Sequence, residues 1–495
     1  MNDGFSGFTR CDRKNFLRLA LISAVLFIVP LCFFDLAGGD ETRVAGISAE
    51  MALDGDWLMP KLNGESFLEY PPLYYAAVAA CYRLFGFIPF AAKLPTALAA
   101  VAGVLVLYAM MRILRRSVRE AFAGAFMLAT GAQYWSNSYD CRVDIMLTAF
   151  CILAWTGFAV MEFSGSGRAR RLIGMLMLAA GFAGGMLTKN LPGIAIPLSG
   201  IGCALFFLDL KKRHFSFCSW CRLAGAVMLG VVPYALYLLL LYRTHGIEAV
   251  QTVFIYNNFG RFSGANSDHS SPWWGYLTDL PELFQPYLLF LIGGIVLFFR
   301  KIRQSGSEHA VLMLSFLLIP FLMLSAASGK RMVYLLPLAA PMAMTAAPAL
   351  IWACRKLPRR NAVKLLRRHI GILIGAVTLL AALAAGAVGS YVSHRASFAP
   401  AFAEAERLCR EDSARRLVLV LPRLSERLAG AAVFYHRAVV PQLQEWSELK
   451  PGDVALGGCR PKEPLPQLPS GFAAKRFPEA KLLLVYPASG DPRKP

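Results

Sequence analysis

The sequence predicts a mainly α-helical protein that crosses a membrane many times and ends in a small α/β domain. Of its 495 residues, 56% are hydrophobic and only 17% are charged, and the mean hydropathy is +0.49. Soluble proteins carry about a quarter charged residues, so this composition excludes an ordinary soluble protein. The long apolar runs end near residue 392, after which charged residues and prolines return.

A membrane-spanning helix needs about 20 mostly apolar residues, and about eleven stretches of this chain meet that requirement. They are residues 17–35, 92–112, 121–138, 143–162, 172–188, 191–208, 223–242, 282–299, 310–328, 332–354 and 369–391. Basic residues precede the first stretch, as in a signal peptide, but no convincing small-residue cleavage site follows it. We therefore expect a retained first helix.

The basic residues predict how these helices are oriented. The chain has 51 Lys+Arg against 31 Asp+Glu, and the excess lies in short clusters between apolar runs. This distribution is typical of cytoplasmic loops and not of a surface that binds nucleic acid. With the N-terminus inside, the clusters fall on the cytoplasmic side only if the short apolar stretch 73–87 does not cross. We therefore expect residues 73–87 to form a juxtamembrane or re-entrant helix.

This orientation places most of the unusual polar residues at one face of a bacterial inner membrane, toward the periplasm. We predict a transmembrane catalytic domain over residues 1–392, with a periplasmic loop at 36–91. A soluble periplasmic α/β domain is expected over residues 393–495. Its short strands are predicted at residues 417–422, 431–436, 453–458 and 481–487.

The loop after the first apolar stretch contains a cluster of acidic residues that begins at Asp40. Acidic side chains are costly beside a membrane unless they reach water or a partner. Asp40, with Glu41 beside it, is a candidate for deprotonating an acceptor; a solvated acid or a helix N-cap is the alternative. Arg43 lies on the same face of a helix, where it could bind a phosphate or pair with Asp40.

Three more candidates lie near the ends of apolar stretches. Glu69 could be a metal ligand or could complement a helix dipole. Asp144 follows Arg142, its candidate structural partner, and could instead bind a substrate hydroxyl. Lys189 could complement a helix C-terminus or contact an anion such as a polyprenyl phosphate.

Arg261 lies in a watery loop, where it could be only a surface charge. The pair Lys330-Arg331 lies on the side where the positive-inside rule disfavours basic residues, and Tyr334 shares a helix face with Lys330. Each residue alone is explained by an ordinary structural role. Together they supply a base and several fixed cations, which is what transfer from a phosphate leaving group needs.

The cysteines give little functional information. Eleven are scattered through the chain, many in apolar stretches where they act as small apolar residues. Cys218 and Cys221 form a lone CxxC, for which an ordinary loop is favoured over a zinc or redox site. Cys409 and Cys459 could pair if the C-terminal domain is periplasmic.

Several motifs, in order along residues 15–350, resemble a known family. They are DETRVAGISAEM, GDWLMPKLNG, EYPPLYY, RVDIMLTAF, GMLTKNLPG, NNFGRF followed by PWW, and GKRMVYLLP. They resemble the bacterial aminoarabinose transferase and protein-mannosyltransferase-like group. Members of this group are multi-span GT-C glycosyltransferases that use a polyprenyl-phosphate sugar donor.

The resemblance implies roles for individual residues. Asp40 matches the catalytic acidic residue, Arg43 a donor-phosphate contact and Glu69 a metal-associated glutamate. The remaining matches, at cavity or phosphate-contact positions, are Asp144, Lys189, Arg261 and Tyr334. Two positions differ, since Tyr70 replaces a lysine of the aminoarabinose branch and Asn258 replaces a histidine linked to metal. The predicted donor-phosphate and substrate-binding set is therefore Arg43, Glu41, Tyr70, Asp144, Lys189, Arg261, Lys330 and Tyr334.

The expected function is an inverting glycosyltransferase. It would move a sugar, aminoarabinose being one candidate, from undecaprenyl phosphate to lipid A or another envelope glycan. A divalent metal is an open expectation, and no nucleic-acid partner is expected. The alternatives are transfer to protein or surface polysaccharide, a lipid or sugar transporter, and an assembly protein whose tail binds a partner. A transporter would favour buried charges at mid-membrane and internal symmetry, and the sequence displays neither.

Overall fold

A computed structural model describes residues 9–37, 39–165, 167–260, 271–356, 361–421 and 425–488. Packing divides the chain into two compact units. The first unit comprises residues 1–29, 69–74 and 96–385, and the second comprises residues 30–68, 75–95 and 386–495. This division does not follow the predicted boundary at residue 392, because segments near the N-terminus pack with the C-terminal domain.

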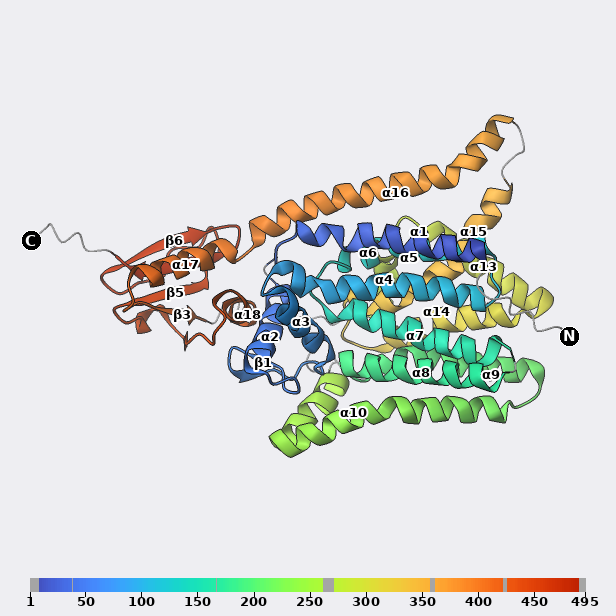
Figure 1. The fold of residues 1–495 in the computed structure, drawn as a ribbon, viewed down its shortest axis with the longest axis horizontal. Coiled ribbons are helices and arrows are strands. Elements are labelled where there is room, and N and C mark those ends of the chain that lie inside the picture. Colours follow the sequence, from blue (N-terminus) through green and yellow to red (C-terminus); the bar gives the residue numbers. More distant parts are fainter. Residues whose placement is uncertain are drawn as a thin grey trace, which may run out of the picture. The chain divides into compact units, whose positions relative to one another are not determined.

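Helices make up most of the chain (Figure 1). From the N-terminus to the last long helix they are α1 (Arg10–Phe27), η1 (Val29–Cys32), α2 (Asp40–Asp54), α3 (Leu73–Phe85), α4 (Pro89–Ile113), α5 (Val118–Thr130), α6 (Ala132–Asn137), α7 (Val143–Phe163), α8 (Arg168–Lys189), α9 (Pro192–Lys212), α10 (Phe217–Gln251), η2 (Thr252–Gly260), α12 (Gly275–Leu283), α13 (Leu288–Ser305), α14 (Glu308–Ala326), η3 (Met332–Leu338), α15 (Ala339–Lys356) and α16 (Asn361–Ala396). Within the described residues, nine helical segments are long and apolar enough to cross a membrane. If the bent helix pair α12–α13 is counted as one span, the number of candidate spans in the described residues rises to ten.

The expected span at residues 121–138 is wrong. The backbone at Gly131 is extended, so the stretch forms two short helices, α5 and α6. The amide of Ala132 instead donates to the carbonyl of Gln285 at 3.0 Å. By contrast, the apolar stretch at residues 73–87 forms the 13-residue helix α3, which is too short for a comfortable span.

Glycines bring α7 and α8 into close contact in the first unit. A Cβ on Gly157 would lie 2.3 Å from the amide nitrogen of Leu178, and one on Gly174 would lie 2.4 Å from that of Met161. The two backbones therefore touch, and any side chain at either glycine would separate the helices. This contact fixes the helices that carry Asp144 and Lys189.

The C-terminal part of the second unit is built on a five-stranded mixed sheet (Figure 1). Its elements are α17 (Ala399–Glu411), β3 (Arg416–Val420), α18 (Ser425–His436), β4 (Gln442–Leu443), η4 (Trp446–Glu448), β5 (Asp453–Gly458), β6 (Phe472–Phe477) and β7 (Leu482–Pro487). The strand order is β4-β3-β5-β7-β6, with β3 parallel to β4 and β5, and β7 antiparallel to β5 and β6. Three of the four predicted strands are thereby confirmed.

The fourth predicted strand, at residues 431–436, is wrong because this run lies in helix α18. A short apolar run has no period that separates a buried strand from a buried helix. The same unit contains α2, whose first turn carries Asp40, and a hairpin of β1 (Lys61–Leu62) and β2 (Glu65–Ser66). Asn63 in this hairpin exchanges two 2.8 Å hydrogen bonds with the backbone of Val440.

Candidate functional site

Helix α2 begins at Asp40 and thereby fixes the position of the predicted acidic residue. Gly39 precedes it with φ of +154°, a conformation that L side chains rarely adopt. Asp40 and Glu41 both lie in the first turn, where negative charge complements the helix dipole. The N-cap is Gly39 and no side chain caps the helix, so the N-cap alternative for Asp40 is wrong, while its catalytic role stays a prediction.

Glu41 is held in a buried ion pair. Its Oε1 lies 2.5 Å from Nζ of Lys93, and both side chains are almost fully buried. Its Oε2 accepts a hydrogen bond from the backbone amide of Ala37 at 2.9 Å. This arrangement holds Glu41 at the start of α2, and the substrate contact expected from the sequence stays a prediction.

Arg43 lies between two carboxylates and an aromatic ring. Its Nη1 is 2.8 Å from Oε2 of Glu426, and its Nη2 is 3.8 Å from Oδ1 of Asp40. The guanidinium carbon is 5.4 Å from the centroid of the Phe67 ring. Arg43 and Asp40 therefore do form the pair that their spacing predicted, and a carboxylate from the C-terminal domain joins them.

In the first unit, Lys189 is the centre of a second cluster. Its Nζ forms a hydrogen-bonded ion pair with Asp144, and both side chains are buried. The same atom lies 4.6 Å from the centroid of the Tyr334 ring and 5.6 Å from that of Tyr70. Three other predicted site residues from distant parts of the sequence thus lie around the ammonium group of Lys189.

The partner predicted for Asp144 was wrong. Arg142 instead has its Nε 3.6 Å from Oδ2 of Asp140. Asp144 lies in the first turn of α7, and α8 ends at Lys189, so the contact between these helices brings the two charges together. Tyr70 and Tyr334 cover the ammonium with aromatic surface, an arrangement that favours a cation when water is excluded.

The turn after Lys189 is fixed by side-chain amides. Asn190 has φ of +56°, and its Oδ1 accepts from the hydroxyl of Tyr234 at 3.0 Å. Asn258 in η2 accepts from the amide of Leu191 at 3.1 Å and donates to the carbonyls of Val253 and Phe254. The side-chain amide of Asn258 therefore links this turn to η2 by hydrogen bonds.

The ammonium group of Lys330 is hydrogen-bonded to backbone carbonyls. Its Nζ donates to the carbonyl of Ser271 at 3.0 Å and to that of Ala327. It also lies 5.9 Å from the centroid of the Tyr276 ring, and burial lowers the pKa of Lys330. These contacts describe a structural cation that joins two loops, so the predicted phosphate-binding role of Lys330 gains no support.

The structure does not test two other predicted site residues, Arg261 and Glu69. Arg261 lies outside the described residues. Within the described part of the chain, no group of three or more His, Cys, Asp and Glu side chains could hold a metal ion. The metal-ligand role of Glu69 stays a prediction, and no chemical step is assigned to a metal. All eleven cysteines are free, including Cys409 and Cys459.

The structure adds three residues that the sequence did not single out, namely Lys93, Asn190 and Glu426. Lys93 carried a usable signal, since a lysine within an apolar helix needs a partner. Glu426 carried no such signal in the sequence, because it lies 383 positions from its partner Arg43.

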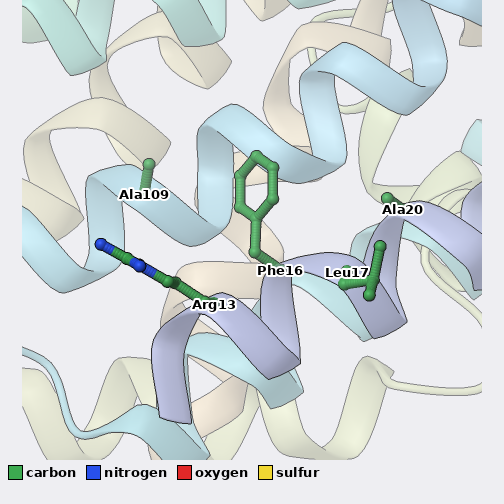
Figure 2. A pocket seen from close by; sticks show the side chains of 5 residues that line it. All are labelled: Arg13, Phe16, Leu17, Ala20 and Ala109. Carbon is green, nitrogen blue, oxygen red and sulfur yellow. The ribbon is translucent and has the colours of Figure 1, made fainter. Parts of the chain in front are cut away.

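A hollow of 560 Å³ between α1 and α4 lies apart from the predicted residues. It is lined by Arg13, Phe16, Leu17, Ala20 and Ala109 (Figure 2). Four of these five side chains are apolar, and none supplies an acid or a nucleophile. We therefore assign no chemistry to this hollow.

The fold is that of the multi-span GT-C glycosyltransferases. The crystal structure of ArnT from Cupriavidus metallidurans bound to undecaprenyl phosphate is similar with a TM-score of 0.72, at 20% identity. The similarity covers 95% of this chain and 97% of that one. The archaeal oligosaccharyltransferase AglB from Archaeoglobus fulgidus is similar with a TM-score of 0.52 at 14% identity, over 87% of this chain and 64% of that one.

The sequence comparisons identify particular relatives. Residues 69–237 match the family model described as dolichyl-phosphate-mannose-protein mannosyltransferase. An undecaprenyl phosphate-alpha-4-amino-4-deoxy-L-arabinose arabinosyl transferase of Pseudomonas aeruginosa strain PAO1 is 30% identical over 374 residues, 75% of this chain. This chain spans 65% of the length of that relative. The resemblance seen in the motifs is confirmed.

Proposed function

We propose that this protein is a glycosyltransferase that takes its sugar from a polyprenyl-phosphate donor. The Lys189 cluster is the main structural support, because it provides a buried, fixed ammonium that could face a phosphate. The names of the relatives give the donor class: curated relatives act on an undecaprenyl-phosphate sugar, and the similar ArnT structure is bound to undecaprenyl phosphate.

The proposed reaction is a single displacement with inversion. An acceptor hydroxyl attacks the anomeric carbon while the bond from that carbon to the phosphate oxygen breaks. Asp40 orients the hydroxyl and accepts its proton. The lipid phosphate leaves with the bonding electrons, and its charge is stabilised by Lys189 and Arg43. We retain Arg261 as a further phosphate contact on the strength of the motif.

The proposed location is the inner membrane of a bacterium, with the reaction on the periplasmic side. The distribution of basic clusters between apolar stretches supports this orientation. The proposed acceptor is lipid A or another envelope glycan, by analogy with the arabinosyl transferases. The match of residues 69–237 to a protein-mannosyltransferase model favours a protein acceptor as the second candidate.

The test uses the purified protein with an undecaprenyl-phosphate-linked aminoarabinose and lipid A. Mass spectrometry should detect glycosylated lipid A together with released undecaprenyl phosphate, and both products should be lost in Asp40→Asn and Arg43→Ala. Profiling of envelope lipids in a deletion strain would identify another sugar or acceptor by its missing mass. Movement of the intact donor across liposomes without any transfer would instead favour a transporter and reject the proposal.

A further inference from the structure

Helices α2 and α18 touch through two glycines in the second unit. A Cβ on Gly46 would lie 2.2 Å from the carbonyl oxygen of Gly430, and one on Gly430 would lie 2.4 Å from that of Thr42. Arg43 is three residues before Gly46, and Glu426 is four residues before Gly430. These spacings keep each charged residue on the same helix face as its glycine. The glycine contact therefore brings Arg43 and Glu426 together.

The resulting contacts orient the Arg43 guanidinium. One Nη lies 2.8 Å from Glu426 and the other 3.8 Å from Asp40, while Phe67 covers the group from 5.4 Å. An arginine has five N–H donors in a rigid fork. Arg43 can therefore contact both carboxylates at the same time.

We propose that Glu426 is a positioning residue that holds Arg43 beside Asp40, so that the C-terminal domain takes part in the transfer reaction. The proposal rests on the function proposed above, in which Asp40 serves the acceptor and Arg43 the leaving phosphate. Without the Glu426 charge, the guanidinium would turn toward Asp40. That closer pairing would occupy the carboxylate oxygens that the acceptor hydroxyl needs.

A purely structural role does not account for this ion pair. The Glu426 side chain is 54% exposed, and exposed ion pairs contribute little to stability. The close glycine contact already holds the two helices together. A Glu426→Gln variant should therefore fold normally and report on the orientation of Arg43.

The experiment compares Glu426→Gln and Glu426→Asp with Glu404→Gln in the full-length protein. Glu404 is a matched control, because it pairs with Arg407 at 2.9 Å and Lys475 at 3.1 Å in the same domain. Misplacement of a reacting group by about 1 Å can cost about 100-fold in rate, so we expect Glu426→Gln to lower kcat by about 10-fold or more. The KM for the donor should change little, Glu426→Asp should recover part of the rate, and Glu404→Gln should match the wild type.

A second measurement does not depend on activity. Phenylglyoxal modifies accessible arginines, and peptide mass spectrometry measures the rate at each position. The labelling rate of Arg43 in Glu404→Gln should match the wild type, and the rate in Glu426→Gln should differ from it several-fold because the guanidinium is reoriented. Wild-type kcat or unchanged Arg43 labelling in Glu426→Gln would overturn the proposal. An inactive wild type would reject the proposed function, and the labelling would still decide whether Glu426 holds Arg43.

Discussion

The ammonium of Lys189 is ion-paired with the carboxylate of Asp144, 45 positions earlier in the chain. Both groups are buried, and the Tyr334 ring lies 4.6 Å from Nζ of Lys189. Two opposite charges that are buried away from water attract one another strongly. This attraction roughly offsets the free-energy cost of removing both groups from water, so the pair adds little to the stability of the fold. The pair is therefore weak evidence for added stability, and its role in the reaction stays part of the proposal.

This relationship predicts that stability and activity can be separated. Removing one partner of a buried pair leaves an uncompensated charge, so Asp144→Asn should lower the free energy of unfolding by about 3–5 kcal/mol. The double variant Lys189→Met with Asp144→Leu should regain most of that loss, because no charge remains buried. It should nevertheless be inactive. Denaturant unfolding in detergent and the transfer assay measure the two effects, and transfer activity in the double variant would exclude Lys189 from the mechanism.

Local sequence patterns predicted much of the fold. The strand at residues 453–458 was predicted with its observed bounds because it is an apolar run between turn residues. The predictions failed where tertiary contacts decide the structure. Residues 431–436 are helical where α18 packs on α2, and the stretch 121–138 is interrupted at Gly131.

The candidate site was predicted as a set of residues but not as a set of contacts. Asp40 and Arg43 are one helical turn apart, so their pairing followed from spacing alone. The nearest charge to Asp144 in the sequence is Arg142, whereas its observed partner is on another helix. Contacts across tens or hundreds of positions depend on helix packing, for which a single sequence has no local signal. The convergence of the Asp40 and Lys189 clusters on one substrate stays a prediction.

The glycine contact between α2 and α18 predicts a sharp steric effect. Gly46→Ala should destabilise the protein by about 1–3 kcal/mol, because the added methyl group meets the backbone of Gly430. Gly202→Ala is the control, since nothing lies within 4 Å of a Cβ at that position in α9. The thermal unfolding midpoint of Gly202→Ala should be equal to or higher than that of the wild type. Equal stabilities for the two variants would show that the helices do not touch at Gly46.

The raised pKa of Glu50 in α2 leads us to expect that the stability of the protein depends on pH. Burial raises the pKa of Glu50 above its usual 4.5, although hydrogen bonds from the amides of Gly64 and Asn63 oppose the shift. The folded state therefore binds this proton more tightly than the unfolded state, and stability falls as the pH rises through 4.5 toward the folded-state pKa. The Glu50→Gln side chain still has an oxygen that can accept a hydrogen bond from the amide of Gly64. Because Gln does not titrate, this variant should not lose stability as the pH rises. Its unfolding midpoint should exceed the wild type at neutral pH, and the advantage should disappear below pH 4.5. A constant difference at all pH values would contradict this assignment.

The last prediction concerns whether Asp40 and Lys189 serve the same reaction. Residues that act as a unit in one chemical step are strongly non-additive, because the second substitution removes a contribution that the first has already abolished. Asp40→Asn with Lys189→Met should therefore lower kcat little more than the more damaging single variant. Asp40→Asn with Gly202→Ala supplies the reference, since Gly202→Ala should leave the rate unchanged. If the losses for Asp40 and Lys189 instead multiply, Lys189 acts independently of the proton transfer, and a role in folding alone becomes the better explanation for its pairing with Asp144.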